Sequence, residues 1–113
     1  MEYFVFGSNL AGRHGRGSAL EALRNHGAVY GRGYGPQGRS FAIPTKDEDL
    51  KPLPLHRVAY YIDLFKIYAY EHPHDTFNVV KIGCGLAGFS EDVMAPLFAN
   101  APDNCRLPEG WRR

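Results

Sequence analysis

The sequence predicts an α/β fold in which a small, mostly parallel sheet is flanked by helices. Two observations support this class. Short apolar runs typical of buried strands alternate with amphipathic runs typical of helices, and glycine-rich turns join them. A chain of 113 residues has the length of one domain, so we expect residues 1–113 to form a single unit.

Three apolar runs are predicted as strands. The first is YFVF at residues 3–6, which ends at a glycine. The second is RSFAIPT at residues 39–45, closed by Pro44, and the third is FNVVKI at residues 77–82. Short apolar runs bounded by Gly or Pro are typical of strands inside a sheet.

Three further runs are predicted as helices. GSALEALRNH at residues 17–26 has apolar residues at helical spacing, and Gly27 is well placed to end it. LHRVAYYIDLFKIYAYEH at residues 55–72 has the longest amphipathic pattern. SEDVMAPLFANA at residues 90–101 starts at Ser90, a typical N-cap, followed by acidic residues that suit the amino end of a helix.

Composition limits the classes of function. The net charge of +1 provides no global field for nucleic acid or an anionic membrane, so any anion binding has to be local. Two cysteines give no disulfide framework, and the first residues lack the pattern of a signal peptide. No apolar run approaches a bilayer span. We therefore expect a cytoplasmic protein with no membrane partner and no cofactor or metal.

Two glycine-rich turns each run from a predicted strand into a predicted helix. They are GSNLAGRHGRGS at residues 7–18 and GCGLAG at residues 83–88. Bare backbone N–H groups at such a junction bind phosphate, and two such turns suit a diphosphate with a group at each end. Neither turn contains the Gly-Lys-Ser/Thr of a P-loop, and the first lacks the Gly-x-Gly-x-x-Gly of a dinucleotide-binding unit. The alternative is that the glycines only shape tight turns.

These motifs resemble the macro domain, a family that binds ADP-ribose. The similarity is greatest to the branch that removes ADP-ribose from modified carboxylates or bases. That branch carries an Arg-x-Gly-x-Gly-x-Ala helix start, an Ile-Thr-Lys strand end and an Ile-Gly-Cys-Gly-Leu-Asp loop. The matching segments here are RHGRGSA at residues 13–19, IPTK at residues 43–46 and IGCGLA at residues 82–87. Because the strand before the first loop already begins the chain, we expect a reduced form of the macro-domain fold.

The resemblance leaves two functions open. In the hydrolase branch a lysine and an aspartate share the catalytic work. Lys46 matches the lysine and is our candidate catalytic residue, whereas Ala87 stands in place of the aspartate. An alanine cannot move a proton, so a nearby carboxylate would have to replace it, with Asp47, Glu48, Glu91 and Asp92 as candidates. The alternative is a binder that recognises or sequesters the nucleotide, or the ADP-ribosylated protein or nucleic acid, without turnover. For Lys46 itself, the alternative to a catalytic role is a solvated loop lysine beside the acidic residues 47–49.

The predicted ligand-binding residues come from the two turns. Backbone N–H groups of residues 15–18 and 83–88 are expected to hold the diphosphate. Arg16 either reaches a phosphate or has only a surface role, and Asn9 either lies near the distal ribose or only forms a turn. The complete predicted set is Ser8, Asn9, Arg13, Gly15, Arg16, Gly17, Ser18, Gly83, Cys84, Gly85, Leu86, Ala87, Gly88 and Phe89.

Other segments allow different interpretations. VYGRGYGPQGRSF at residues 29–41 alternates aromatic, Arg and Gly residues, which suits stacking on single-stranded nucleic acid. Its alternative is a hairpin or loop whose Tyr30 or Tyr34 packs on the core or lies against an adenine. Cys84 is read as a small packed thiol rather than a nucleophile. The HPHD stretch at residues 72–75 is read as a polar loop rather than a metal site.

Overall fold

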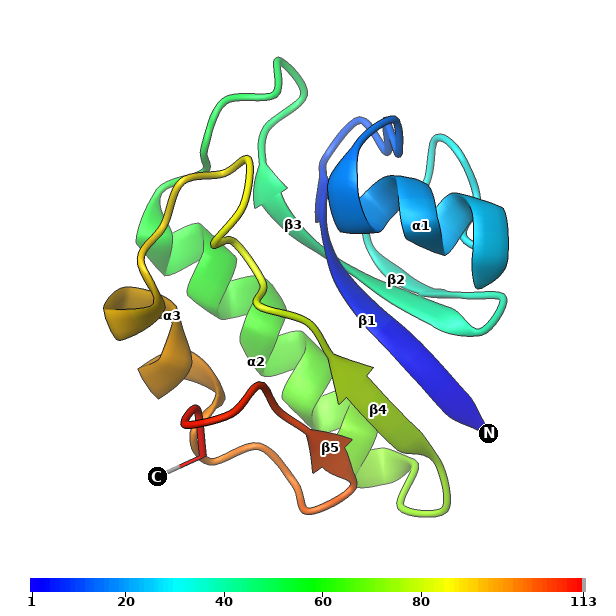
Figure 1. The fold of residues 1–113 in the computed structure, drawn as a ribbon, viewed down its shortest axis with the longest axis vertical. Helices are drawn as coiled ribbons and strands as arrows, with labels where there is room; N and C mark the ends of the chain where they lie inside the picture. The colour runs from blue at the N-terminus through cyan, green and yellow to red at the C-terminus, as the bar shows by residue number, and fades with distance from the viewer. Residues whose placement is uncertain (113) are drawn as a thin grey trace.

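A five-stranded sheet forms the centre of the computed structural model, which describes residues 1–112 (Figure 1). Its strand order is β2-β3-β1-β4-β5, and every neighbouring pair is parallel except β2 and β3. The predicted α/β class with a mostly parallel sheet is confirmed. The strands are β1 (Glu2–Asn9), β2 (Gly35–Gln37), β3 (Ser40–Lys46), β4 (Thr76–Val79) and β5 (Cys105–Arg106).

Helices cover both faces of this sheet in the described chain (Figure 1). They are α1 (Gly17–Asn25), α2 (Leu55–Glu71) and α3 (Glu91–Phe98), as the periodicity predicts. Neighbouring residues of β1 point to opposite faces. Val5 packs in a large cluster with side chains of α2 and α3, while Phe6 packs in a small cluster with alanines of α1. The sheet is therefore a middle layer between α1 and the α2–α3 pair.

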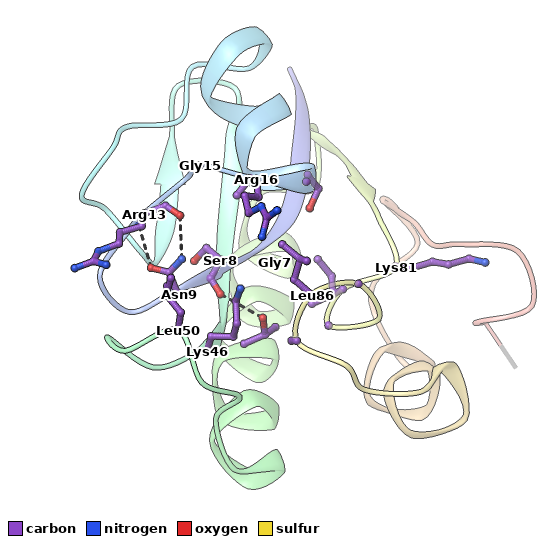
Figure 2. A pocket seen from close by; sticks show the side chains of 18 of the residues that line it. Gly7, Ser8, Asn9, Arg13, Gly15, Arg16, Lys46, Leu50, Lys81 and Leu86 are labelled. Carbon is purple, nitrogen blue, oxygen red and sulfur yellow. Dashed lines mark hydrogen bonds between the residues drawn. The ribbon is translucent and has the colours of Figure 1, made fainter.

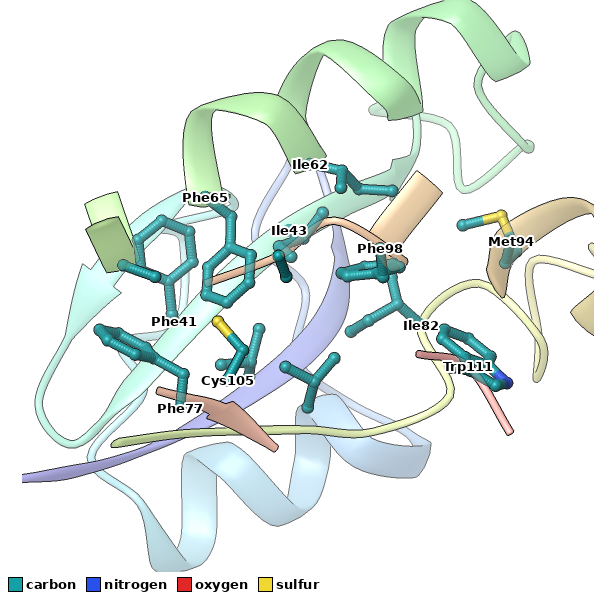
Figure 3. Close-up of a cluster of buried hydrophobic side chains, with 14 of the residues drawn as sticks. Phe41, Ile43, Ile62, Phe65, Phe77, Ile82, Met94, Phe98, Cys105 and Trp111 are labelled. Atoms are coloured by element: carbon teal, nitrogen blue, oxygen red, sulfur yellow. The ribbon is translucent and has the colours of Figure 1, made fainter. Parts of the chain in front are cut away.

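Helix α2 supplies the main apolar stripe of the large cluster (Figure 3). Val58, Ile62, Phe65 and Ala69 have no solvent-exposed surface, as the predicted amphipathic pattern requires. Phe65 lies between Phe41 of β3 and Phe77 of β4, with ring centroids 5.2 and 5.6 Å away. These contacts join the two strands that flank β1 through one helix.

Several predicted boundaries were wrong. β1 continues to Asn9, and β4 ends at Val79 instead of residue 82, because the chain turns there to enter the second glycine-rich stretch. Pro44 does not close β3, which runs on to Lys46. Pairing with β2 extends only to Ala42, so at Pro44 the strand has one partner and a proline is tolerated.

The predictions for the end of α1 and the start of α3 had different outcomes. Gly27 follows α1 with φ of +76°, and the Ala28 N–H donates to the Ala22 carbonyl at 3.1 Å, so the predicted glycine stop is confirmed. Ser90 does occupy the N-cap of α3, but its side chain makes no capping hydrogen bond.

No helix among the described residues has the length and apolar character that a bilayer crossing requires.

Candidate functional site

A cavity of about 480 Å³ lies where β1 and β3 end and where the chain leaves β4 (Figure 2). These strands are parallel, so their carboxyl ends meet at one edge of the sheet. In open α/β sheets ligands bind at this edge, at the point where the order of the strands along the chain reverses. That point is at β1, because β3 lies beside it on one side and the later strand β4 lies beside it on the other.

Most of the predicted site residues line this one cavity. Both glycine-rich turns contribute, and Lys46 enters from the end of β3. The lining residues that were predicted are Ser8, Asn9, Arg13, Gly15, Arg16, Gly17, Ser18, Lys46, Gly83, Gly85, Leu86 and Ala87. Three predicted residues, Cys84, Gly88 and Phe89, do not line it. Seven lining residues were not in the predicted set: Gly7, Ala19, Tyr30, Thr45, Leu50, Lys81 and Ile82.

The charged residues of the lining are all basic. Arg13, Arg16, Lys46 and Lys81 contribute to it, and no Asp or Glu does among the described residues. Lys81 is paired with Glu91 at 3.1 Å, and Figure 2 shows its side chain directed away from the cavity. The other three form no ion pair within residues 1–112. A chain of nearly zero net charge thus has a local cationic cavity, which favours an anion.

The amino end of α1 opens onto the cavity without a protein cap. Arg16 is the N-cap residue, and its side chain makes no capping hydrogen bond. The first helical bond runs from the Leu20 N–H to the Arg16 carbonyl at 3.2 Å, so the three N–H groups before Leu20 have no helical acceptor. Uncapped N–H groups and the positive end of the helix dipole make this edge suitable for a phosphate.

The loop at residues 83–88 uses part of its own backbone, which corrects one prediction. The N–H groups of Cys84 and Gly88 donate to the Lys81 and Gly85 carbonyls at 3.1 and 3.0 Å. These two cannot also hold a ligand as expected. The Phe89 N–H is likewise used, donating to the Gly83 carbonyl at 2.9 Å. Gly83, Gly85, Leu86 and Ala87 keep N–H groups that donate no hydrogen bond within the described chain.

At two positions of the lining, neither the backbone conformation nor the packing requires a glycine. A Cβ atom placed on Gly15 or Gly85 would meet no heavy atom within 4 Å, and neither residue has a positive φ. The fold therefore tolerates a side chain at both positions. What a side chain would change is the space of the cavity, since the two residues come from opposite turns and both line it.

Asn9 belongs to the turn, which decides between its two interpretations. Its Nδ2 donates to the Arg13 carbonyl at 3.0 Å, and its Oδ1 accepts from the Arg13 N–H at 2.9 Å. The side chain is 3% exposed. The neighbouring Ser8 hydroxyl donates to the Gly33 carbonyl. Both side chains thus fix the conformation of the first turn, and Asn9 does so through the backbone of Arg13.

None of the four carboxylates considered as proton carriers lines the cavity. Asp47 accepts from the N–H groups of Asp49 and Lys51 at 2.9 and 3.0 Å. Glu91 accepts from the Trp111 indole at 3.0 Å and pairs with Lys81, and these hydrogen bonds hold the pKa of that carboxyl below its usual range. Glu91 and Asp92 line a different groove, between α3 and the 109–111 segment. Lys46 therefore lies in the cavity without an ion pair to any acidic residue of the described chain.

The side chains of Cys84 and His14 pack against other parts of the protein. Cys84 packs against the large core cluster, and burial raises the pKa of its thiol, as expected for a packed thiol. His14 is completely buried, its Nε2 lies 3.0 Å from the Arg32 carbonyl, and its ring contacts Phe6 edge-on. His14 therefore joins the first turn to the 31–33 segment. No cluster of metal-ligating side chains occurs among the described residues, including the 72–75 loop.

The tyrosine-rich segment forms the predicted hairpin. β2 pairs antiparallel with β3, and the Tyr34 ring packs edge-on against Phe41 with centroids 5.8 Å apart. The Arg32 guanidinium donates to the Pro36 carbonyl at 3.2 Å, within the segment itself. These contacts favour the hairpin interpretation over a surface for single-stranded nucleic acid.

None of the family models, curated proteins or solved structures compared with this chain matches it.

Proposed function

We propose that the chain binds ADP-ribose or a closely related NAD-derived nucleotide, with the diphosphate between the two glycine-rich turns. One observation carries the proposal: Gly15 and Gly85, from opposite turns, leave open space over one cavity whose charged residues are all basic. Because neither φ nor packing requires glycine at these two positions, we attribute the glycines to ligand binding. A backbone without side chains lets an anion approach the N–H groups closely.

The donors available suit a diphosphate better than a single phosphate. One side of the cavity offers the uncapped amino end of α1 with Arg16, and the other offers the N–H groups of Gly85, Leu86 and Ala87. Hydrogen bonds to a charged group contribute about 1.5 to 3 kcal/mol each. Two such sets facing one space bind two linked phosphates more strongly than either set binds one.

The resemblance to macro domains points to the same ligand. The Arg-x-Gly-x-Gly-x-Ala motif, the strand-end lysine and the Gly-Cys-Gly-Leu loop are far apart in sequence, yet residues of all three line one cavity. On this basis we propose a reduced macro-domain fold for the chain. A ligand with a sugar beyond the diphosphate would extend toward Lys46.

Hydrolysis of an ADP-ribosyl linkage is the second candidate, and Lys46 is the observation that favours it. An amine at the cavity is a suitable nucleophile for the anomeric carbon or its aldehyde form once deprotonated. The missing element is a proton carrier, since no carboxylate of the described chain lines the cavity and Ala87 stands in the loop. The geometry therefore supports binding more strongly than turnover.

Two variants separate the candidates. If the protein is a lysine-dependent hydrolase, Lys46→Ala lowers release of ADP-ribose from modified protein or DNA by orders of magnitude with little change in affinity. Ala87→Asp then raises the rate by restoring a proton carrier. For a binder, wild type, Lys46→Ala and Ala87→Asp all release nothing, and Lys46→Ala costs only the affinity of one ammonium contact.

Calorimetric titration with ADP-ribose, ATP and NAD tests the binding proposal itself. We expect ADP-ribose to bind more tightly than the other two. Absence of heat with all three nucleotides, from protein with a cooperative melting transition, would overturn the proposal.

A further inference from the structure

We propose that Leu50 is a specificity-determining residue of this site, an apolar wall against the part of the ligand that lies beyond the diphosphate on the Lys46 side. This inference rests on the proposed function. It concerns the turn between β3 and α2 at residues 47–51, to which neither glycine-rich motif contributes.

Leu50 has a backbone conformation that disfavours leucine. Its φ of +64° is the only positive φ of a non-glycine residue in the described chain. A Cβ atom in this left-handed region contacts the backbone unfavourably, and Gly or Asn would form the same turn at lower cost. Such outliers persist where the surroundings impose them, and they occur preferentially at functional sites.

The surroundings of Leu50 do impose this conformation. The Asp47 N–H donates to the Lys51 carbonyl at 2.7 Å, and the Leu50 N–H donates to the Asp47 carbonyl at 3.1 Å. The Asp47 carboxylate closes the turn by accepting from the N–H groups of Asp49 and Lys51. A β-bridge between Lys46 and Pro52 ties both ends together. Asp47 is thus a positioning residue for the turn.

Folding alone does not explain a leucine at this position. Its side chain is 41% exposed and belongs to neither core cluster, so its burial contributes little to the stability of the fold. It does line the cavity, beside Lys46, and Figure 2 shows these two residues on the opposite side from Leu86. A strained, partly exposed leucine at a cationic cavity is explained by contact with an apolar surface of the ligand.

The class of ligand follows from this juxtaposition. A bare pyrophosphate offers no apolar surface, whereas the face of a ribose or a base does. Leu86, 61% exposed at the tip of the second turn, and Tyr30, 60% exposed, add apolar surface at the same cavity. The site is therefore suited to a diphosphate that carries a ring, and Leu50 contacts the ring nearest to Lys46.

Titration of ADP-ribose and of pyrophosphate into Leu50→Gly tests the proposal. We expect a loss of about five- to tenfold in ADP-ribose affinity, the effect of removing a partly buried apolar contact. Pyrophosphate affinity stays unchanged, and the melting temperature is unchanged or higher because the strain is relieved. Leu50→Asn, which also tolerates positive φ, gives the same loss. Leu55→Ala is the matched control, because Leu55 is 40% exposed and does not line the cavity.

The outcomes distinguish this proposal from the proposed function. If the wild type binds ADP-ribose and Leu50→Gly binds it equally well, the specificity role is overturned while the binding proposal stands. An equal loss for pyrophosphate also overturns it, because the turn would then act on the diphosphate. If the wild type binds neither probe, both proposals fail.

Discussion

Two glycine-rich stretches of this chain have similar composition and opposite surroundings. In the 31–38 stretch, Gly33 lies against the first turn so closely that a Cβ atom would be 2.1 Å from the Asn9 carbonyl oxygen. In the 83–88 stretch, a Cβ atom on Gly85 would meet nothing within 4 Å. Gly33 is bare because two backbone segments pack together there, whereas Gly85 is bare beside an open cavity.

The difference shows that glycine density alone does not identify a phosphate-binding loop. What distinguishes Gly15 and Gly85 from Gly12 and Gly33 is free space above the glycine at the lining of the cavity. Gly12 and Gly33 are required for packing the first turn on the hairpin, since a Cβ atom on Gly12 would lie 2.3 Å from the Gly31 backbone. Gly15 and Gly85 have no such requirement, and both face the cavity.

The largest expected effect on stability separates these two kinds of glycine. Gly33→Ala forces the hairpin away from the first turn, and we expect the free energy of unfolding to fall by more than about 3 kcal/mol. Gly85→Ala is the control, with an expected change below about 1 kcal/mol. Chemical denaturation measures both. Equal losses for the two variants would contradict the division into packed and open glycines.

A second, smaller effect concerns the charge at the open stretches. Arg16→Ala removes one cation from the amino end of α1, and we expect ADP-ribose affinity to fall about tenfold, as for one exposed charge-assisted hydrogen bond. Arg24→Ala, in the last turn of α1, is the matched control and leaves affinity unchanged. Titration at two salt concentrations adds a check, because screening weakens the Arg16 contribution. Equal effects of the two variants would argue against a phosphate at the α1 amino end.

A third prediction concerns how the second stretch is held. Trp111 donates a hydrogen bond to the carboxylate of Glu91, which follows the 83–88 stretch. Lys81, which precedes this stretch, forms an ion pair with the same carboxylate. These contacts lower the pKa of Glu91, so the folded state favours the ionised carboxylate. Its contribution to stability is present above the ordinary carboxyl pKa and is lost as the pH falls through the lowered value.

Glu91→Gln should therefore melt slightly below the wild type at pH 7. The difference should shrink as the pH falls below the ordinary carboxyl pKa and through the lowered value, where the wild-type carboxyl becomes protonated. Melting curves across this range measure it. A difference that is independent of pH would mean that the lost contact is not ionic.

The smallest expected effect concerns the side chain within the second stretch. Cys84 packs on the core, and burial raises the pKa of its thiol, so little thiolate is present at neutral pH. We expect Cys84→Ala to bind ADP-ribose within about twofold of the wild type, since that turn binds through its backbone. Slow alkylation of Cys84 at pH 7 is the accompanying measurement. A large loss of affinity would assign the thiol a direct role.

Sequence patterns predicted the regular elements with long periodicity, included β2 only within one interpretation of residues 29–41, and missed β5. The four-residue and three-residue spacing of Val58, Ile62, Phe65 and Ala69 is sufficient to identify α2. β2 and β5 have three and two residues, too few for any alternation to show, and their pairing depends on tertiary contacts. Pro44 was read as a stop because sequence does not show that β3 has lost one neighbour there.

The sequence predicted the part of the cavity that the two glycine-rich motifs line, but not the part that other turns line. Glycine spacing placed both turns at the ends of strands, and residues of both turns do line one cavity. Leu50 carries no motif and reaches the cavity only through the conformation of its turn, whereas contact of Tyr30 with the ligand was one of several interpretations of residues 29–41. The strained φ of Leu50 leaves no trace in the sequence, because leucine gives no sign of left-handed backbone. Likewise, the engagement of Cys84 and Gly88 N–H groups within their own loop depends on geometry.

Titration of ADP-ribose into the wild type and Gly85→Glu tests the central claim most directly. The open space over Gly85 predicts that the variant keeps the wild-type melting temperature. The added carboxylate would occupy the diphosphate position and repel the ligand, and we expect affinity to fall by about a hundredfold or more, the effect of losing two charge-assisted hydrogen bonds. A folded Gly85→Glu variant that binds ADP-ribose as tightly as the wild type would contradict the assignment of this turn to the diphosphate.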